Sequence, residues 1–336
     1  MLDFFRGEFM NIKKLSVLAG VSPATVSKAF NGAKDISNDT REKIFALAKQ
    51  YNCYEKYNKV KYPKKVVAVI CPEIESEFYA NLVSYIKKCL TKLGMIMVLS
   101  LSEFSSEKES ELISYHLSCK NADGILLLDS HSNVKYNKDI PIVDICSSPM
   151  PKEIDCVNMD LSSAIADAVL LFKNNGHVDI GYIGENLTNE RKVFFEQALL
   201  MHNLKVNPDF IVVSDQRFTQ AGYSGIQKLY SLEKRPTAIL CAYDYIALGA
   251  IECISDHNES VPENFSIIGV DDISFSSHSN VNLTTIRPNI KEICNIGIEL
   301  LVKKINQKSY CIRQNINVRG ELVNRSSVKN LFLDKQ

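Results

Sequence analysis

The chain contains 336 residues, of which 46% are hydrophobic and 23% are charged. This length suggests about two domains, and the apolar content is typical of globular proteins, which excludes disorder over most of the chain. Lys plus Arg and Asp plus Glu are equal at 39 each, which excludes a uniformly basic nucleic-acid coat and an acidic disordered tail.

The charge is distributed unevenly along the chain. Residues 10–65 hold twelve Lys and Arg but four acids, a net charge of +8, while residues 1–9 carry −1 and the remainder carries −7. A small basic segment of this kind is the electrostatic footprint of a phosphate-binding surface. A solvated helical face followed by a charged linker is the alternative interpretation.

The cysteines and the N-terminal residues indicate a cytoplasmic protein. None of the ten cysteines stands in a CxxC pair, so a zinc or redox motif is not indicated. Most lie within apolar runs, where a reduced thiol behaves as a small hydrophobic side chain. The first nine residues do not predict a signal peptide, and no run approaches the roughly 18 apolar residues of a membrane span.

The basic segment predicts three helices. The first covers residues 11–19, with apolar residues on one face. Ser22 and Pro23 suit the N-cap and first position of a second helix, which runs to about Phe30. The third helix follows Ser37. Two short helices across a glycine-containing turn predict a helix-turn-helix.

Residues 18–32, with the sequence LAGVSPATVSKAFNG, resemble the headpiece of the lactose-repressor/galactose-repressor (LacI/GalR) family. Residues 37–44 extend the resemblance, and Lys28 stands where the family usually has Arg. The match runs from Met10 over nearly the whole chain. Residues 1–9 lie outside it as an N-terminal extension, with Met10 as the alternative start.

The resemblance implies a recognition helix in the major groove, with its first turn facing the bases. Ala24 offers apolar contact to a thymine methyl group, and Lys28 is expected to donate to guanine. Short polar side chains suit phosphate contacts, although capping and packing also explain Thr25 and Ser27. The predicted DNA-binding residues are Ser22, Pro23, Ala24, Thr25, Ser27, Lys28, Asn31 and Val60.

Residues 52–65 form a lysine-rich linker that departs from the family pattern. In the family, a Pro-Asn pair introduces a hinge helix, and paired hinge leucines wedge into the minor groove of the bent DNA. Here the Pro-Asn pair is missing and Val60 stands near the wedge position. The lysines still favour phosphate contacts, and we expect the DNA to be bent less.

From residue 66 onward, strand and helix patterns alternate, which predicts parallel sheets with helices on both faces. The strands are expected at 66–71, 95–101, 124–128, 140–145, 180–183, 210–213, 238–241 and 266–270. The helices are expected at 79–93, 107–119, 162–174, 191–202, 219–230, 246–257 and 290–306. One sheet rarely uses so many residues, so two lobes are expected.

The predicted fold class is therefore α/β, with a three-helix helix-turn-helix head and a two-lobed core of doubly wound parallel sheets. The domains are an extension at 1–9, a head at 10–51, a linker at 52–65 and a core at 66–336. Lobe 1 is expected at about 66–158 and 290–319, and lobe 2 at about 159–289 and 320–336.

Motifs in the core also resemble the repressor family and, through it, the type I periplasmic sugar-binding proteins. They occur in the family's order along the chain, which makes a chance resemblance very improbable. They are PEIESEFY at 72–79, NGHVDIGYIG at 175–184, DYIALG at 244–249, IGVDD at 268–272, LTTIRP at 283–288 and ELVNRSS at 321–327.

Cores of this kind bind a small ligand between the lobes, where the carboxyl ends of the strands converge. The resemblance implies effector contacts at Phe78, Tyr79, Arg191, Phe218, Tyr243 and Asp271. The aromatic side chains would supply stacking faces, and Arg191 and Asp271 would bind vicinal hydroxyl groups. The sequence leaves other roles open: Phe218 and Tyr243 as core residues, Arg191 as a solvated side chain and Asp271 as a turn cap.

We therefore expect a transcription regulator, a repressor of carbohydrate-utilisation genes controlled by a sugar or sugar phosphate. The resemblance implies a homodimer on a pseudo-palindromic operator with half-sites about one helical turn apart. No cofactor or metal is expected, and no P-loop, GxSxG or GxGxxG motif favours an enzyme. A regulator with a degenerate effector site under the control of a protein partner, and a sugar-binding protein without a regulatory role, are the alternatives.

Overall fold

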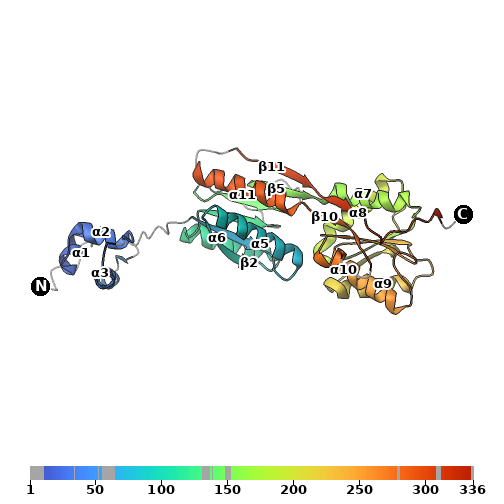
Figure 1. The fold of residues 1–336 in the computed structure, drawn as a ribbon, viewed down its shortest axis with the longest axis horizontal. Helices are drawn as coiled ribbons and strands as arrows, with labels where there is room; N and C mark the ends of the chain where they lie inside the picture. Colours follow the sequence, from blue (N-terminus) through green and yellow to red (C-terminus); the bar gives the residue numbers. More distant parts are fainter. Residues whose placement is uncertain are drawn as a thin grey trace. The chain divides into compact units, whose positions relative to one another are not determined.

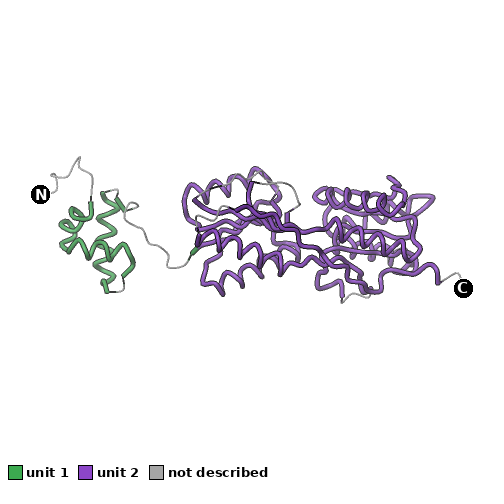
Figure 2. Tube along the Cα trace, turned by 90° about the horizontal axis from the view of Figure 1, so that it is seen from above, with its two compact units in different colours: residues 1–65 green, residues 66–336 purple. Residues whose placement is uncertain are grey.

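The computed structural model divides the chain into two compact units, residues 1–65 and 66–336 (Figure 2). Each unit has its own hydrophobic core. The residues described are 11–33, 35–51, 53–54, 65–130, 137, 139–147, 153–277, 281–307 and 312–333.

The first unit contains the three predicted helices, α1 (Ile12–Ala19), α2 (Pro23–Phe30) and α3 (Asn38–Gln50). The side chain of the residue before each helix accepts a hydrogen bond from a backbone N–H of its first turn; these caps are Asn11, Ser22 and Ser37. Such caps satisfy donors that have no partner within the helix. The turn between α1 and α2 is made by Gly20, whose φ of 71° favours glycine.

The head is held together by a small apolar core. Leu15, Val26 and Ile44, one from each helix, are fully buried. Phe30 and Phe45 pack with their ring centroids 5.2 Å apart. This core fixes the angle between α1 and α2 and leaves the polar face of α2 to the solvent.

The second unit contains two lobes, each built on a sheet of six strands (Figure 1). In lobe 1 the strand order is β11-β5-β4-β3-β1-β2, and all the pairs are parallel. The strands are β1 (Val66–Cys71), β2 (Ile96–Leu101), β3 (Gly124–Leu128), β4 (Ile142–Ile145), β5 (Asp155–Asp160) and β11 (Asn315–Arg319). The helices are α5 (Glu77–Lys92), α6 (Ser106–Cys119) and α11 (Ile290–Asn306).

Strand β1 shows why a central strand of lobe 1 can be apolar without alternation. Val67 and Val69 belong to the core cluster that includes α5 and α11, whereas Ala68 and Ile70 belong to the cluster that includes α6. Because helices cover both faces of the sheet, each residue of the strand is buried whichever way it points.

Lobe 2 has the strand order β12-β10-β9-β8-β6-β7. The strands are β6 (Ile180–Glu185), β7 (Ile211–Ser214), β8 (Ala238–Cys241), β9 (Ser266–Val270), β10 (Thr284–Arg287) and β12 (Glu321–Val323). The helices are α7 (Leu161–Asn174), α8 (Asn189–Met201), α9 (Phe218–Tyr230) and α10 (Asp244–Asp256). Strand β12 pairs antiparallel with β10, so this sheet departs at its edge from the all-parallel prediction.

The chain passes from one lobe to the other after β5, after β10 and after β11. These crossings place the carboxyl ends of β5 and β10 at the junction of the lobes, as the ribbon shows (Figure 1). Side chains at these strand ends and in the loops that follow them therefore face the space between the lobes.

Candidate DNA-binding helix and ligand cleft

The predicted DNA contacts of the head gather on α2 and its flanking residues. All those within the described residues reach the surface, and Val60 lies outside those residues, together with most of the linker. The exposed residues are Ser22, Pro23, Ala24, Lys28 and Asn31, and the partly buried ones are Thr25 and Ser27. The buried face of the same helix carries Val26, Ala29 and Phe30.

The polar residues of α2 also make local hydrogen bonds. Ser22 Oγ accepts from the backbone N–H of Thr25 at 3.0 Å and lies 2.8 Å from Thr25 Oγ1. Asn31 Nδ2 donates to Ser27 Oγ at 3.3 Å. A hydroxyl group combines a donor with two acceptor lone pairs, so capping leaves capacity for a phosphate contact.

Lys28, the predicted base-contacting residue, pairs with an acid of the head. Its Nζ lies 2.6 Å from Asp35 Oδ2, and both side chains are more than half exposed. This hydrogen bond to Lys28 is the main reason that the pKa of Asp35 is lowered. An exposed pair of this kind contributes little to stability. Lys28 can therefore leave Asp35 and contact DNA with little loss of stability.

Asp35→Asn is expected to strengthen DNA binding by about two- to fivefold at low salt, because it removes a negative charge beside the recognition helix and releases Lys28. Fluorescence anisotropy with an operator duplex measures the change. Glu42→Gln, which neutralises an exposed acid on α3, is the matched control and should change the affinity less. Equal gains in the two variants would contradict a specific role for the Lys28–Asp35 pair.

A cavity of about 150 Å³ lies between the two lobes of the second unit. Its lining comes from both lobes, and we call it the cleft cavity. It contains all six residues for which effector contacts are predicted: Phe78, Tyr79, Arg191, Phe218, Tyr243 and Asp271. The structure thus brings together residues that are separated by up to 193 positions in the chain.

Lobe 1 supplies an aromatic wall to the cleft cavity. Phe78 and Tyr79, in the first turn of α5, have ring centroids 5.1 Å apart, and Tyr79 meets Phe104 edge to face at 6.0 Å. The hydroxyl of Tyr79 donates to Asp129 Oδ2 at 2.7 Å. Burial and the charge of Asp129 raise the pKa of Tyr79, so its ring stays neutral and can stack against a ligand.

Arg191 and Asp271 face each other on the lobe 2 side. Arg191 Nη1 donates to the carbonyl oxygen of Ala242 at 2.5 Å and lies 3.7 Å from Asp271 Oδ1. Burial raises the pKa of Asp271, and the charge of Arg191 opposes this shift. The Arg191 side chain is only 17% exposed, so it is not a solvated surface residue.

Phe218 and Tyr243 are linked through the Tyr243 hydroxyl. This hydroxyl accepts from the backbone N–H of Phe218 at 3.0 Å and donates to Glu185 Oε1 at 2.8 Å. The two rings lie edge to face, 6.1 Å apart. Both side chains belong to the cavity wall and also pack against the core.

Arg217 connects the lobes across the cleft cavity. Its Nη1 donates to Glu73 Oε2 of lobe 1 at 2.9 Å, and its Nε lies 3.5 Å from Glu185 Oε2 of lobe 2. The guanidinium group also lies over the rings of Phe104 and Phe218, 5.2 Å and 4.5 Å from their centroids. A second polar link joins the lobes where the backbone N–H and hydroxyl of Ser274 donate to Glu77.

Sequence reasoning missed several polar residues of the cleft cavity, namely Glu73, Asp129, Glu185 and Arg217. The sequence contains a signal for three of them, because each lies at the carboxyl end of a predicted strand. Glu73 and Asp129 follow β1 and β3, and Glu185 ends β6. Ligands of such folds bind at the carboxyl ends of the strands. Arg217 follows no strand directly, so its position depends on how the lobes meet.

The backbone of the cleft cavity contains unusual conformations. Positive φ angles outside glycine are uncommon and cluster at functional sites. In the described chain, five lining residues have them: Phe104 (59°), Asp129 (52°), Cys146 (64°), Phe218 (56°) and Asp271 (102°). This clustering supports the cavity as the candidate functional site of the core.

Two further properties bear on the kind of site. Within the described ranges, no helix is long and apolar enough to cross a membrane. The same residues contain no group of three His, Cys, Asp or Glu side chains that could hold a metal ion.

Comparisons with known proteins agree with this architecture. The profile "Bacterial regulatory proteins, lacI family" matches residues 11–54, and the profile "Periplasmic binding protein-like domain" matches residues 169–328. The HTH-type transcriptional repressor PurR of Actinobacillus pleuropneumoniae serotype 3 (strain JL03) is 30% identical over 338 residues, covering 95% of this chain and 98% of the relative.

Solved structures show the same fold. The lac repressor dimer bound to operator and the anti-inducer ONPF is 19% identical, with a TM-score of 0.71 and coverage of 96% of this chain and 100% of that chain. The complex of the transcriptional regulator CelR with cellobiose is 22% identical, with a TM-score of 0.68 and coverage of 95% and 100%.

Fold and site together define a DNA-binding regulator with a helix-turn-helix head and a periplasmic-binding-protein-like core. The chain belongs to the lacI family of bacterial regulatory proteins.

Proposed function

We propose that this regulator is a cytoplasmic, operator-binding repressor whose affinity for DNA is set by a small molecule in the cleft cavity. One observation carries the proposal. Six residues chosen for effector contact from the sequence line a single cavity between the lobes, in a chain whose other unit exposes a recognition helix. The relative PurR, which aligns with 95% of this chain, is a transcriptional repressor. This supports repression rather than activation.

The cavity would act on DNA binding through the angle between the lobes. A ligand that contacts Tyr79 of lobe 1 and Arg191 of lobe 2 binds one lobe arrangement better than others and so shifts the population toward it. In a dimer, a change in lobe angle alters the spacing of the two heads. The coupling between ligand and operator then follows from a two-state core.

We propose a sugar as the effector and carbohydrate-utilisation genes as the target. Aromatic faces beside carboxylate and guanidinium groups suit a molecule with apolar ring faces and hydroxyl edges. Phe78, Phe218, Arg191 and Asp271 supply such groups here. A structural neighbour with the same fold, the transcriptional regulator CelR, forms a complex with cellobiose, which supports a carbohydrate effector.

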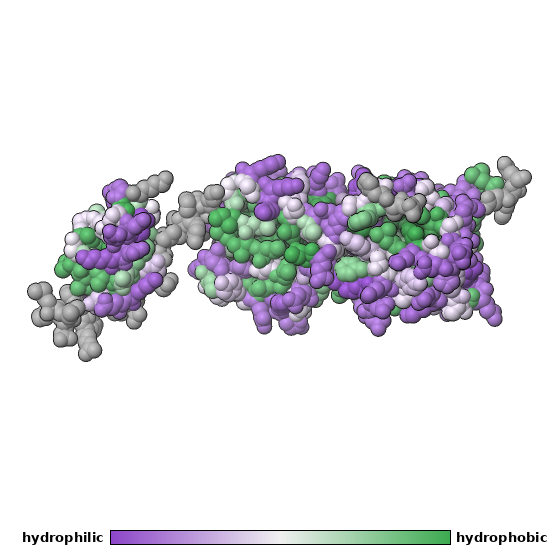
Figure 3. All heavy atoms as spheres, turned by 60° about the horizontal axis from the view of Figure 1, so that its bottom comes forward, coloured by the Kyte–Doolittle hydropathy of each residue, from purple (hydrophilic) through white to green (hydrophobic). Residues whose placement is uncertain are grey.

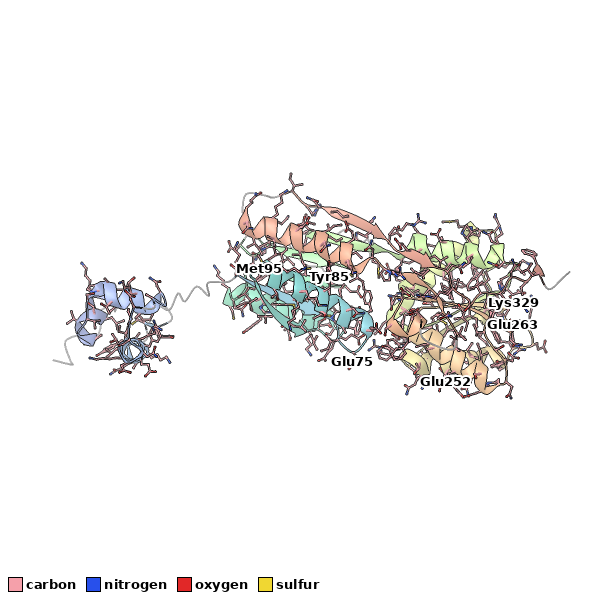
Figure 4. The ribbon with its side chains drawn as sticks, viewed as in Figure 1. Glu75, Tyr85, Met95, Glu252, Glu263 and Lys329 are labelled. Atoms are coloured by element: carbon pink, nitrogen blue, oxygen red, sulfur yellow. The ribbon has the colours of Figure 1, made fainter. Side chains whose placement is uncertain are left out.

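We propose a homodimer that pairs through the edge of the lobe 1 sheet. Strand β2 is one of the two edge strands of this sheet, and its Ile96 and Val98 are 37% and 42% exposed, next to Leu93 at 52%. Figure 3 shows hydrophobic residues gathered on a face of this lobe, and Figure 4 labels Met95, which directly precedes β2, and Tyr85 on α5. An exposed apolar edge invites pairing with another chain.

Val98→Asp is expected to convert the dimer to a monomer and to weaken operator binding by about tenfold or more, because one head holds only one half-site. Analytical ultracentrifugation measures the oligomeric state. Val193→Asp on α8, whose valine is also 42% exposed, is the matched control and should stay dimeric. A dimer that survives Val98→Asp would contradict pairing through β2.

In vitro selection from random double-stranded DNA tests the proposed function, because it finds the preferred binding sequence without a chosen operator. The full chain should enrich a pseudo-palindrome with half-sites about one helical turn apart. Recovery of no consensus sequence would contradict specific operator binding.

A further inference from the structure

The cleft cavity holds more acids than bases. Among the described residues of its lining, carboxylates outnumber guanidinium groups, and the formal net charge is −3. The carboxylates are those of Glu73, Asp129, Glu185, Glu190 and Asp271, and the guanidinium groups are those of Arg191 and Arg217. A ligand that carries a negative charge would therefore be repelled by the carboxylates of this partly desolvated site.

Two carboxylate oxygens of the cavity lack a donor. Among the described side chains, Glu73 Oε1 and Asp271 Oδ1 are buried without a hydrogen-bond partner. Glu73, which is 8% exposed, uses its other oxygen to accept from Arg217. Asp271 Oδ1 lies 3.7 Å from Arg191, too far for a hydrogen bond. A buried acceptor without a donor is costly, so a ligand gains this energy if small shifts of the cavity side chains let its donors reach both oxygens.

The two guanidinium groups are already engaged with protein acceptors. Arg217 is shared between Glu73 and Glu185, and Arg191 donates to the carbonyl oxygen of Ala242 beside Asp271. A phosphate group would have to compete with these acceptors for the guanidinium donors, and would do so among carboxylates that repel it. The arrangement of the described lining residues therefore disfavours an anionic ligand.

The cavity also limits the size of the ligand. Its volume of about 150 Å³ is below the roughly 300–1,000 Å³ of common ligand pockets. Glu73 follows β1 in lobe 1 and Asp271 follows β9 in lobe 2. A ligand that donates to both carboxylates would connect the two lobes.

We infer that the effector is a molecule of monosaccharide size without negative charge, whose hydroxyl or ammonium groups donate to Glu73 and Asp271. This inference rests on the proposed function and excludes a sugar phosphate, which the sequence leaves open. An amino sugar is the best match, since a charge-assisted hydrogen bond from an ammonium group to a buried carboxylate is roughly twice as strong as a neutral one.

Matched probes built on glucose, galactose and mannose test the inference with the full chain. Each set contains the free hexose, its 2-amino-2-deoxy derivative and its 6-phosphate, and binding is measured by thermal shift and isothermal titration calorimetry. In at least one set, the amino sugar should bind at least as tightly as the hexose. The 6-phosphate should bind about tenfold more weakly or not at all.

Glu73→Gln separates the role of the carboxylate from that of the cavity shape. We expect this variant to lose about tenfold or more in affinity for the amino sugar and less for the hexose. Glu75→Gln, an exposed acid on the same loop (Figure 4), is the control and should bind as the unmodified chain does. Circular dichroism confirms that both variants are folded.

Several results would overturn the inference. They are a 6-phosphate that binds as tightly as its hexose, an amino sugar that binds more weakly than its hexose, no binding of any probe, and unchanged amino-sugar affinity in Glu73→Gln. Because the selected operator duplex measures DNA binding separately, intact operator recognition alongside any of these results would leave the proposed repressor function standing.

Discussion

A chain shortened to residues 66–336 should lose specific DNA binding by about 1,000-fold or more, the usual margin between specific and non-specific binding. It should nevertheless remain folded and dimeric. The two units have separate cores, with Leu15, Val26 and Ile44 in the head and the sheet residues in the body. The shortened chain also lacks the segment of charge +8, leaving a body whose net charge is negative.

Electrophoretic mobility shift with the selected duplex measures the loss, and ultracentrifugation and circular dichroism check the fold and the dimer. The full chain provides the comparison and should bind less tightly as salt rises, because lysines and arginines of the head displace counterions from phosphates. Specific binding by residues 66–336 alone would refute the assignment of DNA recognition to α2.

Arg191→Ala should abolish the response to the effector while operator affinity without effector stays within about threefold. A guanidinium group carries five N–H donors, more than the hydrogen bond to Ala242 uses, so it can also bind ligand hydroxyl groups. We expect effector affinity to fall by about 100-fold, in line with the loss of a buried charged donor. The head is a separate unit, so its helices should be unaffected.

The variant also leaves Asp271 buried beside an empty space, which lowers stability. Arg191→Lys keeps the charge and fills most of the space, so it should fold normally yet still lose effector affinity, since lysine lacks the fork of donors. Lys192→Ala, the next residue on α8, is the control. A normal effector response in Arg191→Ala, measured by operator anisotropy, would remove Arg191 from the site.

The sequence predicted the elements that are buried on both faces. Strands β1, β3, β8 and β9 have the expected bounds, because continuous apolar runs of this length are typical of parallel strands between two helical layers. The helices of the head were equally clear, since each has a capping residue and an apolar face.

Strands β5 and β11 were not predicted because polar residues interrupt them. Asn158 is fully buried in β5, where its amide nitrogen donates to Asn315 and Asn317 of β11. The amide side chains satisfy one another across two strands that are 157 and 159 residues apart in sequence. A local sequence pattern cannot predict a pairing between residues so far apart. The pairing forms only because the chain returns to lobe 1 at β11.

The residues of the cleft cavity were likewise only partly predictable from the sequence. Family motifs located Phe78, Tyr79, Arg191, Phe218, Tyr243 and Asp271, all of which line the cavity. They did not show Arg217, because its partner Glu73 lies 144 residues earlier and in the other lobe. The charge balance of the cavity, on which the proposed class of ligand rests, could be read only from the assembled lobes.

The central claim is that occupancy of the cleft cavity controls operator affinity. The most direct test titrates the full chain with the selected duplex at several concentrations of the bound sugar, and then measures sugar affinity with and without the duplex. The account predicts that sugar changes DNA affinity by about tenfold or more, and that DNA changes sugar affinity by the same factor, because the coupling is reciprocal. A sugar that binds the cleft and leaves DNA affinity unchanged would contradict it.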